Sequence, residues 1–236
     1  MQIINIGKLQ KLDYSSSEAY KSLRTNIEFC GKDIKVIAFT SCIPNEGKSS
    51  VTLNIAQAMA ETGKKVLFVD ADMRKSVLIG RHRISKATNG LSHFLSGYKD
   101  LDEVLCKTNV ENLYMILAGP IPPNPSELLG SVLFKRFIEG AREKFDYIII
   151  DLPPLGSVID AAVASQVCDG MCLVLSSNEI SYKFAQKVKA QMDKTDCRIL
   201  GVVLNKVPIK QNGYYGKYYG KYYGKYYGEY YGKEQQ

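Results

Sequence analysis

The chain of 236 residues has no tryptophan, only two histidines and no long apolar run. Its longer apolar stretches, such as residues 147–150 and 171–175, fall far short of the ~20 residues that cross a bilayer. Met1 leads into Gln2 and Ile3 without the extended apolar segment of a signal peptide. We therefore expect a soluble cytoplasmic chain that reaches a membrane only when another protein holds it there.

The six cysteines are scattered and include no Cys-x-x-Cys pair. Cys168 and Cys172 lie four residues apart, but no histidine or further cysteine is near enough to complete a zinc site. This spacing excludes a zinc finger and favours reduced, mostly buried thiols, as in cytosolic proteins.

The remaining composition is ordinary, with 45% hydrophobic and 23% charged residues, which excludes collagen-like and wholly disordered chains. The net charge of +7 is spread along the chain rather than concentrated in a dense basic stripe. It favours acidic partners such as nucleotides or an anionic membrane surface, and no nucleic-acid partner is expected.

Tyrosine is the one residue in excess, because ten of the 16 tyrosines lie in the last 23 residues. They occur in Tyr-Tyr-Gly repeats separated by Lys or Glu, a pattern that cannot form a buried core and predicts a flexible tail over 211–236. An alternative interpretation is a stacking platform for nucleic acid or polysaccharide, although the net charge of this segment is only +2.

Upstream of the tail, short β-branched apolar runs alternate with amphipathic stretches. Strands are predicted over 36–40, 66–69, 113–117, 147–150, 171–175 and 199–204, and helices over 13–30, 50–61, 126–143, 158–167 and 182–194. Apolar strands separated by helices predict an α/β fold with a mostly parallel sheet covered by helices on both faces. We divide the chain into an N-terminal helical segment over 1–34, a nucleotide-binding domain over 35–210 and the tail.

A phosphate-binding loop is predicted between the first of these strands and the next helix. Lys48 would reach the β- and γ-phosphates and Ser49 would offer its hydroxyl to Mg²⁺, while backbone N–H groups cradle the phosphates. The pattern departs from the strict motif, since Cys42 stands where the first glycine is expected, and a chance Gly-Lys-Ser is the alternative. The predicted ATP-binding residues of this segment are Pro44, Asn45, Glu46, Gly47, Lys48, Ser49 and Ser50.

Two further strands end in carboxylates. Asp70 and Asp72 follow one apolar strand and Asp151 follows another. Ligands bind beyond the carboxyl ends of strands in open α/β sheets, so these groups should converge on one Mg-nucleotide. For each aspartate considered alone, the alternative interpretation is a residue that starts a loop or caps a helix. Asn205, at the end of the last strand, is either an adenine contact or a turn residue before Pro208.

These blocks resemble the Walker A, A′ and B motifs of the bacterial tyrosine kinases: Pro44 to Ser49, Val69 to Arg74 and Ile150 to Pro154. The resemblance extends to Ser17–Thr25, Gly90–Ser92, Gly119, residues 124–129 and the tyrosine-rich end. It implies a P-loop NTPase-like protein-tyrosine kinase with ATP and Mg²⁺ as cofactors. Lys48, Asp70 and Asp72 would be catalytic, and Ser49, Asp70 and Asp151 would surround the metal.

The same resemblance implies autophosphorylation of the tail in trans within a homo-oligomeric ring, typically an octamer. The phosphoacceptors would be Tyr214, Tyr215, Tyr218, Tyr219, Tyr222, Tyr223, Tyr226, Tyr227, Tyr230 and Tyr231. Glu18, Lys21 and Arg24 fall on the family's oligomerisation motif, with Lys21 in place of an arginine, although an ordinary solvated helix face is the alternative.

Partners implied by the resemblance are a transmembrane polysaccharide co-polymerase-type adaptor, a cognate phosphotyrosine phosphatase and other protein substrates. The adaptor would recruit the chain to the inner face of the plasma membrane, for capsular or exopolysaccharide synthesis and export.

A second hypothesis is a nucleotide-switch ATPase of the partitioning or septum-positioning type. Those proteins carry a signature lysine five residues before the P-loop lysine, where this chain has Ile43. Their membrane-targeting members also end in an amphipathic helix, unlike the Tyr-Tyr-Gly repeats here.

Overall fold

The computed structural model describes residues 1–7, 12–85 and 89–208, so the predicted tail over 211–236 and all ten of its tyrosines lie outside the described residues. Residues 1–205 form one compact unit. The strands are β1 (Gln2–Ile3), β2 (Val36–Ser41), β3 (Val66–Asp70), β4 (Cys106–Lys107), β5 (Leu113–Ile116), β6 (Tyr147–Asp151), β7 (Gly170–Ser176) and β8 (Arg198–Asn205). The helices are α1 (Tyr14–Glu28), α2 (Lys48–Ala60), α3 (Leu78–His82), α4 (Leu91–Leu95), α5 (Leu101–Val104), α6 (Pro125–Leu129), α7 (Val132–Arg142), α8 (Asp160–Ala164) and α9 (Tyr182–Met192), with a 3₁₀ turn over Ser165–Val167.

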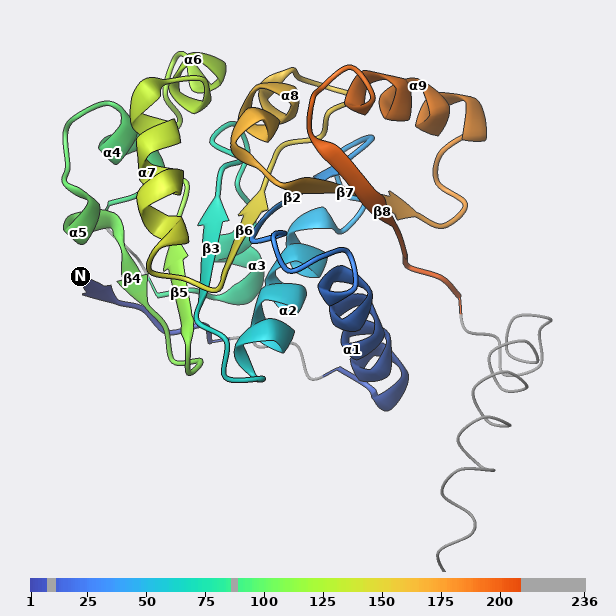
Figure 1. Ribbon diagram of the computed structural model, residues 1–236, viewed down its shortest axis with the longest axis horizontal. Coiled ribbons are helices and arrows are strands. Elements are labelled where there is room, and N and C mark those ends of the chain that lie inside the picture. The colour runs from blue at the N-terminus through green and yellow to red at the C-terminus, as the bar shows by residue number, and fades with distance from the viewer. Residues whose placement is uncertain (8–11, 86–88, 209–236) are drawn as a thin grey trace, which may run out of the picture. The chain divides into compact units, whose positions relative to one another are not determined.

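The described strands form one sheet in the order β1-β4-β5-β3-β6-β2-β7-β8, and every pairing is parallel except β4 with β5. The predicted mostly parallel α/β sheet is therefore confirmed (Figure 1). Parallel alignment brings the carboxyl ends of β3, β6, β2 and β7 to the same edge, which is where the predicted site residues follow their strands.

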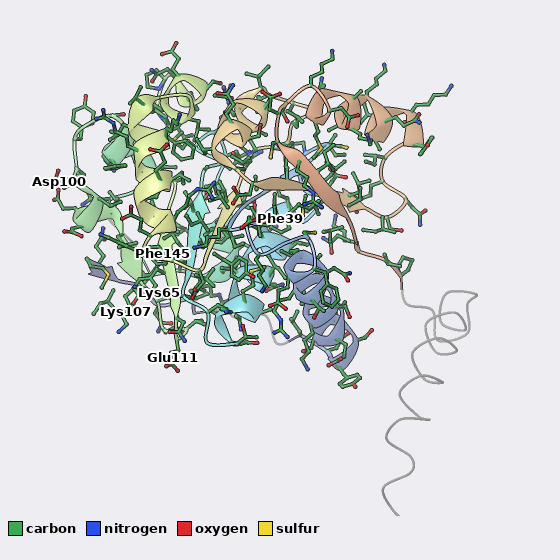
Figure 2. The ribbon with its side chains drawn as sticks, in the orientation of Figure 1. Phe39, Lys65, Asp100, Lys107, Glu111 and Phe145 are labelled. Carbon is green, nitrogen blue, oxygen red and sulfur yellow. The ribbon has the colours of Figure 1, made fainter. Side chains whose placement is uncertain are left out.

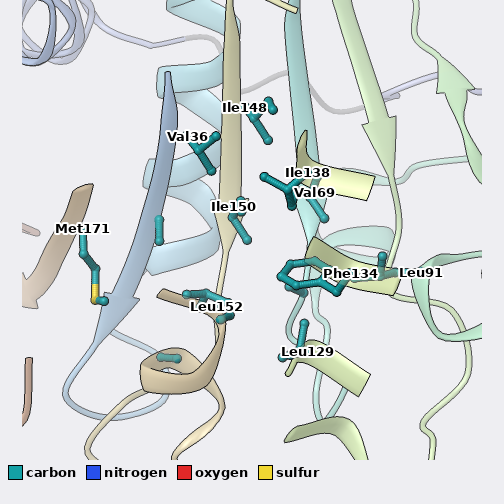
Figure 3. Close-up of a cluster of buried hydrophobic side chains, with 14 of the residues drawn as sticks. Val36, Val69, Leu91, Leu129, Phe134, Ile138, Ile148, Ile150, Leu152 and Met171 are labelled. Carbon is teal, nitrogen blue, oxygen red and sulfur yellow. The ribbon is translucent and has the colours of Figure 1, made fainter. Parts of the chain in front are cut away.

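Helices cover both faces of the sheet because its central strands are apolar on both sides. In β2, Val36 and Ala38 pack with α7, α8 and α9, whereas Ile37 and Phe39 face the opposite layer that contains α1, α2 and α3. Figure 3 shows the first layer, where Phe134 and Ile138 of α7 lie over the strands. Each fully buried large apolar side chain of this kind contributes about 1.5–3 kcal/mol.

At the amino-terminal end of β3, a lysine packs over two aromatic rings. Lys65, directly before β3, lies with its ammonium 5.2 Å from the ring centre of Phe145 and 5.4 Å from that of Tyr114. Figure 2 shows Lys65 beside Phe145 at this end. These cation–π contacts stabilise the connections at this end of the sheet.

Several predicted boundaries are wrong in detail. The helix predicted over 126–143 is two helices, because Gly130 ends α6 and the Ser131 hydroxyl accepts the Phe134 N–H at the start of α7. The helix predicted over 158–167 is short and ends in the 3₁₀ turn. The Asn124 side chain makes no capping hydrogen bond to α6, and its amide donates to Glu127 instead. Pro125 occupies the first helical position, where proline is favoured.

Candidate active site

The phosphate-binding loop connects β2 to α2, and α2 begins at Lys48, two residues earlier than predicted. Gly47, the residue before the helix, has a φ of 86°, and a Cβ there would lie 2.1 Å from Nδ2 of Asn205. Only glycine fits this position. The first N–H groups of any α-helix have no partner within the helix and favour an anion. The start of α2 is thus suited to bind phosphate.

Glu46 braces this loop from within. Its Oε2 accepts the N–H groups of Cys42 at 2.6 Å and Ile43 at 2.8 Å, and its Oε1 accepts that of Ser176 in β7 at 3.1 Å. The side chain is completely buried. Asn205 donates from Nδ2 to the Glu46 carbonyl at 2.8 Å. Glu46 and Asn205 therefore hold the loop against the ends of β7 and β8.

The structure places most of the predicted ATP-binding residues around one pocket, lined among others by Pro44, Asn45, Gly47, Lys48 and Ser49. Glu46, Ser50 and Asn205 are not among its lining residues. Ser50 is turned toward Arg81, whose guanidinium approaches the Ser50 hydroxyl at 3.5 Å. The amide nitrogen of Asn205 donates to the Glu46 carbonyl of the loop. A contact between Asn205 and adenine stays a prediction.

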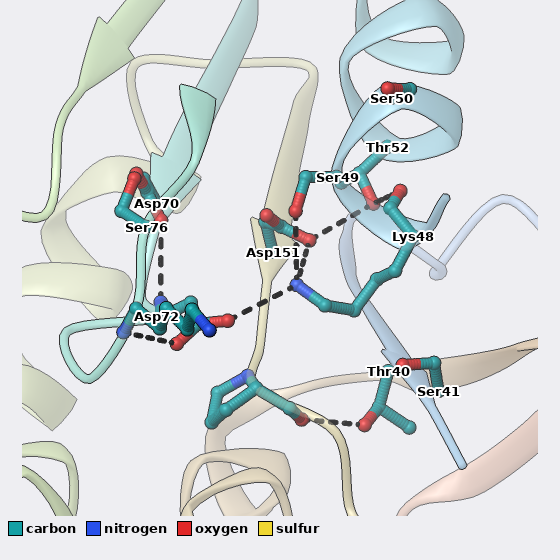
Figure 4. Close-up of polar contacts among 12 residues, drawn as sticks. Thr40, Ser41, Lys48, Ser49, Ser50, Thr52, Asp70, Asp72, Ser76 and Asp151 are labelled. Carbon is teal, nitrogen blue, oxygen red and sulfur yellow. Dashed lines mark hydrogen bonds and ion pairs between the residues drawn. The ribbon is translucent and has the colours of Figure 1, made fainter. Parts of the chain in front are cut away.

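The three strand ends meet at Lys48. Its ammonium lies 2.6 Å from Oδ1 of Asp151, 3.7 Å from Oδ2 of Asp72 and 3.2 Å from the hydroxyl of Ser49 (Figure 4). Asp70 lies beside Asp151, because the two residues are register partners across β3 and β6. The arrangement gathers one cation and three carboxylates at the end of the sheet.

The buried carboxylates of Asp70 and Asp151 repel each other and are also poorly solvated. Burial, followed by repulsion from Asp151, raises the pKa of Asp70 to about 8. Burial also raises the pKa of Asp151, although Lys48 opposes that shift. Without a further cation, at least one of these carboxyls favours its protonated form at neutral pH.

A divalent cation would relieve the repulsion between these buried carboxylates. Oδ2 of Asp151 is buried and has no hydrogen-bond partner, so one carboxylate oxygen is left available to a ligand. Within residues 1–7, 12–85 and 89–208, no group of three or more His, Cys, Asp or Glu could hold a metal by itself. Mg²⁺ takes few protein carboxylates and uses phosphate and water oxygens as its other ligands. Ser49, Asp70 and Asp151 would hold it together with a nucleotide.

A cationic wall of the pocket was not predicted. Arg74, Lys75 and Arg81 line the same pocket as Lys48 and give it a positive excess over Asp72 that suits a polyphosphate. Arg74 is fixed by Asp160, which its Nε and Nη2 approach at 2.7 and 2.9 Å. Burial opposes ionisation of Asp160, but hydrogen bonds from Arg74 and Ser126 keep its pKa below the usual range. The only signal in the sequence was the position of Arg74 two residues after Asp72.

Cys42 occupies the first position of the loop without reactive character. Burial, followed by the nearby Glu46, raises the pKa of its thiol to about 12, and the side chain has no exposed surface. A thiol with such a pKa is almost entirely protonated at neutral pH and is a poor nucleophile. The position serves for packing.

The predicted oligomerisation residues lie on α1, away from the pocket-lining residues. Glu18 and Lys21 form an exposed ion pair at 2.7 Å. Arg24 instead donates from Nη1 to the Ala58 carbonyl of α2 at 3.0 Å. The Arg24 side chain therefore helps to hold α1 on α2, and an additional contact with another subunit stays a prediction.

Comparison with known proteins agrees with this geometry. A family model described as an AAA domain matches residues 34–199. A protein of Streptococcus pneumoniae serotype 4, named tyrosine-protein kinase CpsD, is 45% identical over 207 residues, which cover 87% of this chain and 91% of the relative. This chain belongs to the bacterial tyrosine kinase family. Tyrosine-protein kinase YwqD of Bacillus subtilis is 37% identical over 206 residues, covering 85% of this kinase chain and 86% of YwqD.

Solved structures give the same assignment. The kinase domain of the Escherichia coli tyrosine kinase ETK matches this kinase with a TM-score of 0.80 and 27% identity, over 87% of this chain and 84% of that one. The septum site-determining protein MinD of Pyrococcus horikoshii, complexed with Mg-ADP, matches with a TM-score of 0.63 and 26% identity, over 75% and 72% of the two chains. The kinases are therefore closer to this chain than this representative of the septum-positioning ATPases, and the shared fold is that of nucleotide-binding proteins.

No helix within the described parts of this kinase is both long enough and apolar enough to cross a lipid bilayer.

The raised pKa of Asp70 predicts a stability change for Asp70→Asn. A carboxyl whose pKa rises from 3.8 to about 8 on folding stabilises the fold below about pH 4, and this contribution is lost as the pH rises toward 8. Asparagine mimics the protonated carboxyl. In metal-free buffer, we expect Asp70→Asn to raise the free energy of unfolding by about 1–4 kcal/mol at pH 8 and by much less at pH 5.

Urea unfolding at the two pH values, monitored by circular dichroism, measures this difference. Asp196→Asn is the matched control, because Asp196 is an exposed aspartate on the same protein. An equal stability change for Asp70→Asn at pH 5 and pH 8 would contradict the prediction.

Proposed function

We propose that this chain is an ATP-dependent protein-tyrosine kinase that phosphorylates its own C-terminal tyrosine cluster in trans, with Mg²⁺ as cofactor. The observation that carries the proposal is the meeting of Lys48, Asp72 and Asp151 beside a phosphate-binding helix start. The names of the relatives support the reaction class, and the ten tyrosines in the last 23 residues supply acceptors on the chain itself.

In this mechanism the start of α2 and Lys48 hold the β- and γ-phosphates of ATP. Lys48 leaves its ion pair with Asp151 to do so, and the cationic wall of Arg74, Lys75 and Arg81 screens the remaining phosphate charge. Mg²⁺, when bound at Ser49, Asp70 and Asp151, supplies charge neutralisation for the phosphates. Catalysis then depends mainly on positioning.

Asp72 is the acceptor of the phenolic proton. Its carboxylate borders the pocket, and its backbone is held by a hydrogen bond from the Asp72 N–H to Asp70 at 3.3 Å. The tyrosine oxygen bonds to the γ-phosphorus as its proton passes to Asp72. The bond between the γ-phosphorus and the bridging oxygen breaks, and ADP leaves with that electron pair.

We further propose the cellular setting that the family resemblance implies. The kinase forms a homo-oligomeric ring through the region of Glu18, Lys21 and Arg24. A transmembrane adaptor recruits it to the inner face of the plasma membrane and activates it for capsular or exopolysaccharide synthesis. A phosphotyrosine phosphatase reverses the modification.

The proposal predicts the position of the phosphate. Purified chain incubated with ATP and Mg²⁺, alone or with the cytoplasmic segment of the adaptor, is expected to acquire phosphotyrosine between Tyr214 and Tyr231. A variant with all ten tail tyrosines replaced by phenylalanine should lose more than about 90% of the incorporated phosphate, because the acceptors of the transfer are then absent.

Mass spectrometry of the proteolysed chain locates the modification, and ATP hydrolysis serves as the control for an intact site. ATP hydrolysis without phosphotyrosine, with the adaptor segment present, would refute the kinase proposal and favour a nucleotide switch.

A further inference from the structure

The hydroxyl of Thr52, one turn into α2, lies between two acceptors. Its Oγ1 is 2.8 Å from the Lys48 carbonyl and 3.3 Å from Oδ1 of Asp151 (Figure 4). Lys48 and Thr52 are four residues apart and therefore share the face of α2 that meets the end of β6. The Thr52 side chain is completely buried. A hydroxyl has one proton to donate, so it serves one of the two acceptors at a time, and the shorter distance favours the Lys48 carbonyl.

Oδ1 of Asp151 already has a stronger partner in this structure, because the ammonium of Lys48 lies 2.6 Å from it. Asp151 is 1% exposed, and its other oxygen, Oδ2, has no hydrogen-bond partner among the described residues. An ionised carboxylate in the interior depends on such partners, since its charge is costly to bury without them. The ion pair with Lys48 is therefore the main support of the Asp151 charge.

Nucleotide binding removes this support. In the proposed mechanism Lys48 leaves Asp151 to hold the β- and γ-phosphates, while Asp151 stays buried. The Ser49 side chain also supports the Asp151 carboxylate, but in that mechanism its hydroxyl serves Mg²⁺. Thr52 can replace Lys48 at Oδ1 by rotation of its hydroxyl, without any movement of its backbone. The separation of 3.3 Å is slightly longer than an ordinary O–H···O bond, and the departure of Lys48 leaves the carboxylate free to close the difference.

The rotation costs little at the other acceptor. The Lys48 carbonyl keeps the α-helical hydrogen bond from the backbone N–H of Thr52, four residues further along α2. A side-chain hydroxyl bonded back to such a carbonyl adds little to the stability of a helix. A hydrogen bond to an ionised carboxylate, by contrast, is among the stronger kinds. The exchange is therefore favourable once Lys48 has left.

We propose that Thr52 is a positioning residue of the nucleotide site, whose hydroxyl passes from the Lys48 carbonyl to Oδ1 of Asp151 when a magnesium-bound nucleoside di- or triphosphate draws Lys48 away. The inference rests on the proposed function and adds the residue that keeps Asp151 hydrogen-bonded and oriented while its ion pair is open. Thr52 is not among the residues that line the nucleotide pocket, so it acts through Asp151 rather than on the nucleotide.

The test compares the unmodified full-length chain with Thr52→Val, Thr52→Ser and Thr52→Ala. Valine keeps the shape of threonine without its hydroxyl, and alanine differs from serine in the same way. Calorimetric titration with MgADP is expected to give a dissociation constant about 5- to 20-fold higher for Thr52→Val than for the unmodified chain, and a similar ratio between Thr52→Ala and Thr52→Ser. Thr52→Ser should bind MgADP within about twofold of the unmodified chain, because it keeps the hydroxyl.

Thermal unfolding without nucleotide should rank the same variants differently. Asp151 then has Lys48 as its partner, so Thr52→Val is expected to unfold within about 2 °C of the unmodified chain. Thr52→Ser and Thr52→Ala lack a buried methyl group and should unfold about 2–4 °C lower. Thr62→Val is the matched control, because Thr62 donates its hydroxyl to the Met59 carbonyl at 2.7 Å directly after α2. It should leave the affinity for MgADP unchanged.

Equal affinity for MgADP in Thr52→Val and the unmodified chain would overturn the proposed exchange. A loss of affinity that follows the methyl group, with Thr52→Ser as weak as Thr52→Val, would overturn it as well. If Thr52→Val does not fold, the comparison of Thr52→Ser with Thr52→Ala gives the same decision. The expected order of MgADP affinities without any phosphotyrosine on the unmodified chain would instead overturn the proposed kinase function and leave the role of Thr52 standing.

Discussion

Replacement of Lys48 by methionine is expected to reduce tyrosine phosphorylation by at least about 10³-fold, because the charge that stabilises the transferring phosphoryl group is lost. Methionine has nearly the length of lysine, so the packing around the side chain is largely kept. Lys48 meets all three strand ends in the structure, and among the described residues it is the cation that forms ion pairs with both Asp72 and Asp151.

The same substitution should also lower stability in a pH-dependent way. Removal of the ammonium leaves Asp151 buried without its ion-pair partner, which is costly when the carboxyl is ionised. The loss in the free energy of unfolding should be larger at pH 8 than at pH 6, where the buried carboxyls more readily take up protons.

Quantitative mass spectrometry of phosphotyrosine measures the activity, and thermal unfolding at both pH values measures the stability. Lys187→Met, which changes an exposed lysine of α9, is the matched control and should alter neither. Retention of more than about a tenth of the wild-type rate in Lys48→Met would contradict the assigned role.

Replacement of Asp72 by asparagine is expected to lower kcat for tyrosine phosphorylation by about 10²- to 10³-fold, since an amide cannot accept the phenolic proton. The amide has the same size as the carboxyl, and its oxygen can still accept the Lys75 N–H, which lies 3.1 Å from Asp72 Oδ1. The KM for MgATP should therefore change less than about threefold.

Steady-state phosphorylation of a synthetic peptide with the sequence of residues 213–224, with nucleotide binding measured separately, tests this separation. Asp100→Asn is the control, because Asp100 is an exposed aspartate beside α5 and does not line the nucleotide pocket. If Asp72→Asn weakened MgATP binding as strongly as it slowed transfer, Asp72 would be a nucleotide-binding residue and not the proton acceptor.

The sequence was sufficient for the fold class and for the chemistry at the strand ends. Val36–Ser41, Val66–Asp70 and Tyr147–Asp151 are strands close to their predicted bounds, because each is a continuous apolar run closed by polar residues. The two-residue strands β1 and β4 were not predicted, since segments so short carry no periodic signal. The break between α6 and α7 was missed although Gly130 and Ser131 are a helix end followed by a helix start.

Long-range partners were the part that the sequence could not supply. Glu46 was predicted to bind ATP, but its carboxylate accepts backbone N–H groups from its own loop and from Ser176, which is 130 residues away. Arg74 and Asp160 are 86 residues apart and became partners only through the packing of the strand ends against α8. A local pattern contains no information on such pairs.

The sequence by itself determined that this chain carries a phosphate loop, three acidic strand ends and a store of tyrosines, because each of these depends on residues that are neighbours along the chain. Only the tertiary structure decided which groups touch: Lys48 with Asp151, Glu46 with the loop that contains it, and Arg74 with Asp160. The physical reason is the order of the strands. The pairing of β3 with β6 brings Asp70 and Asp72 beside Asp151 and Lys48, and this order is set by the packing of the whole sheet.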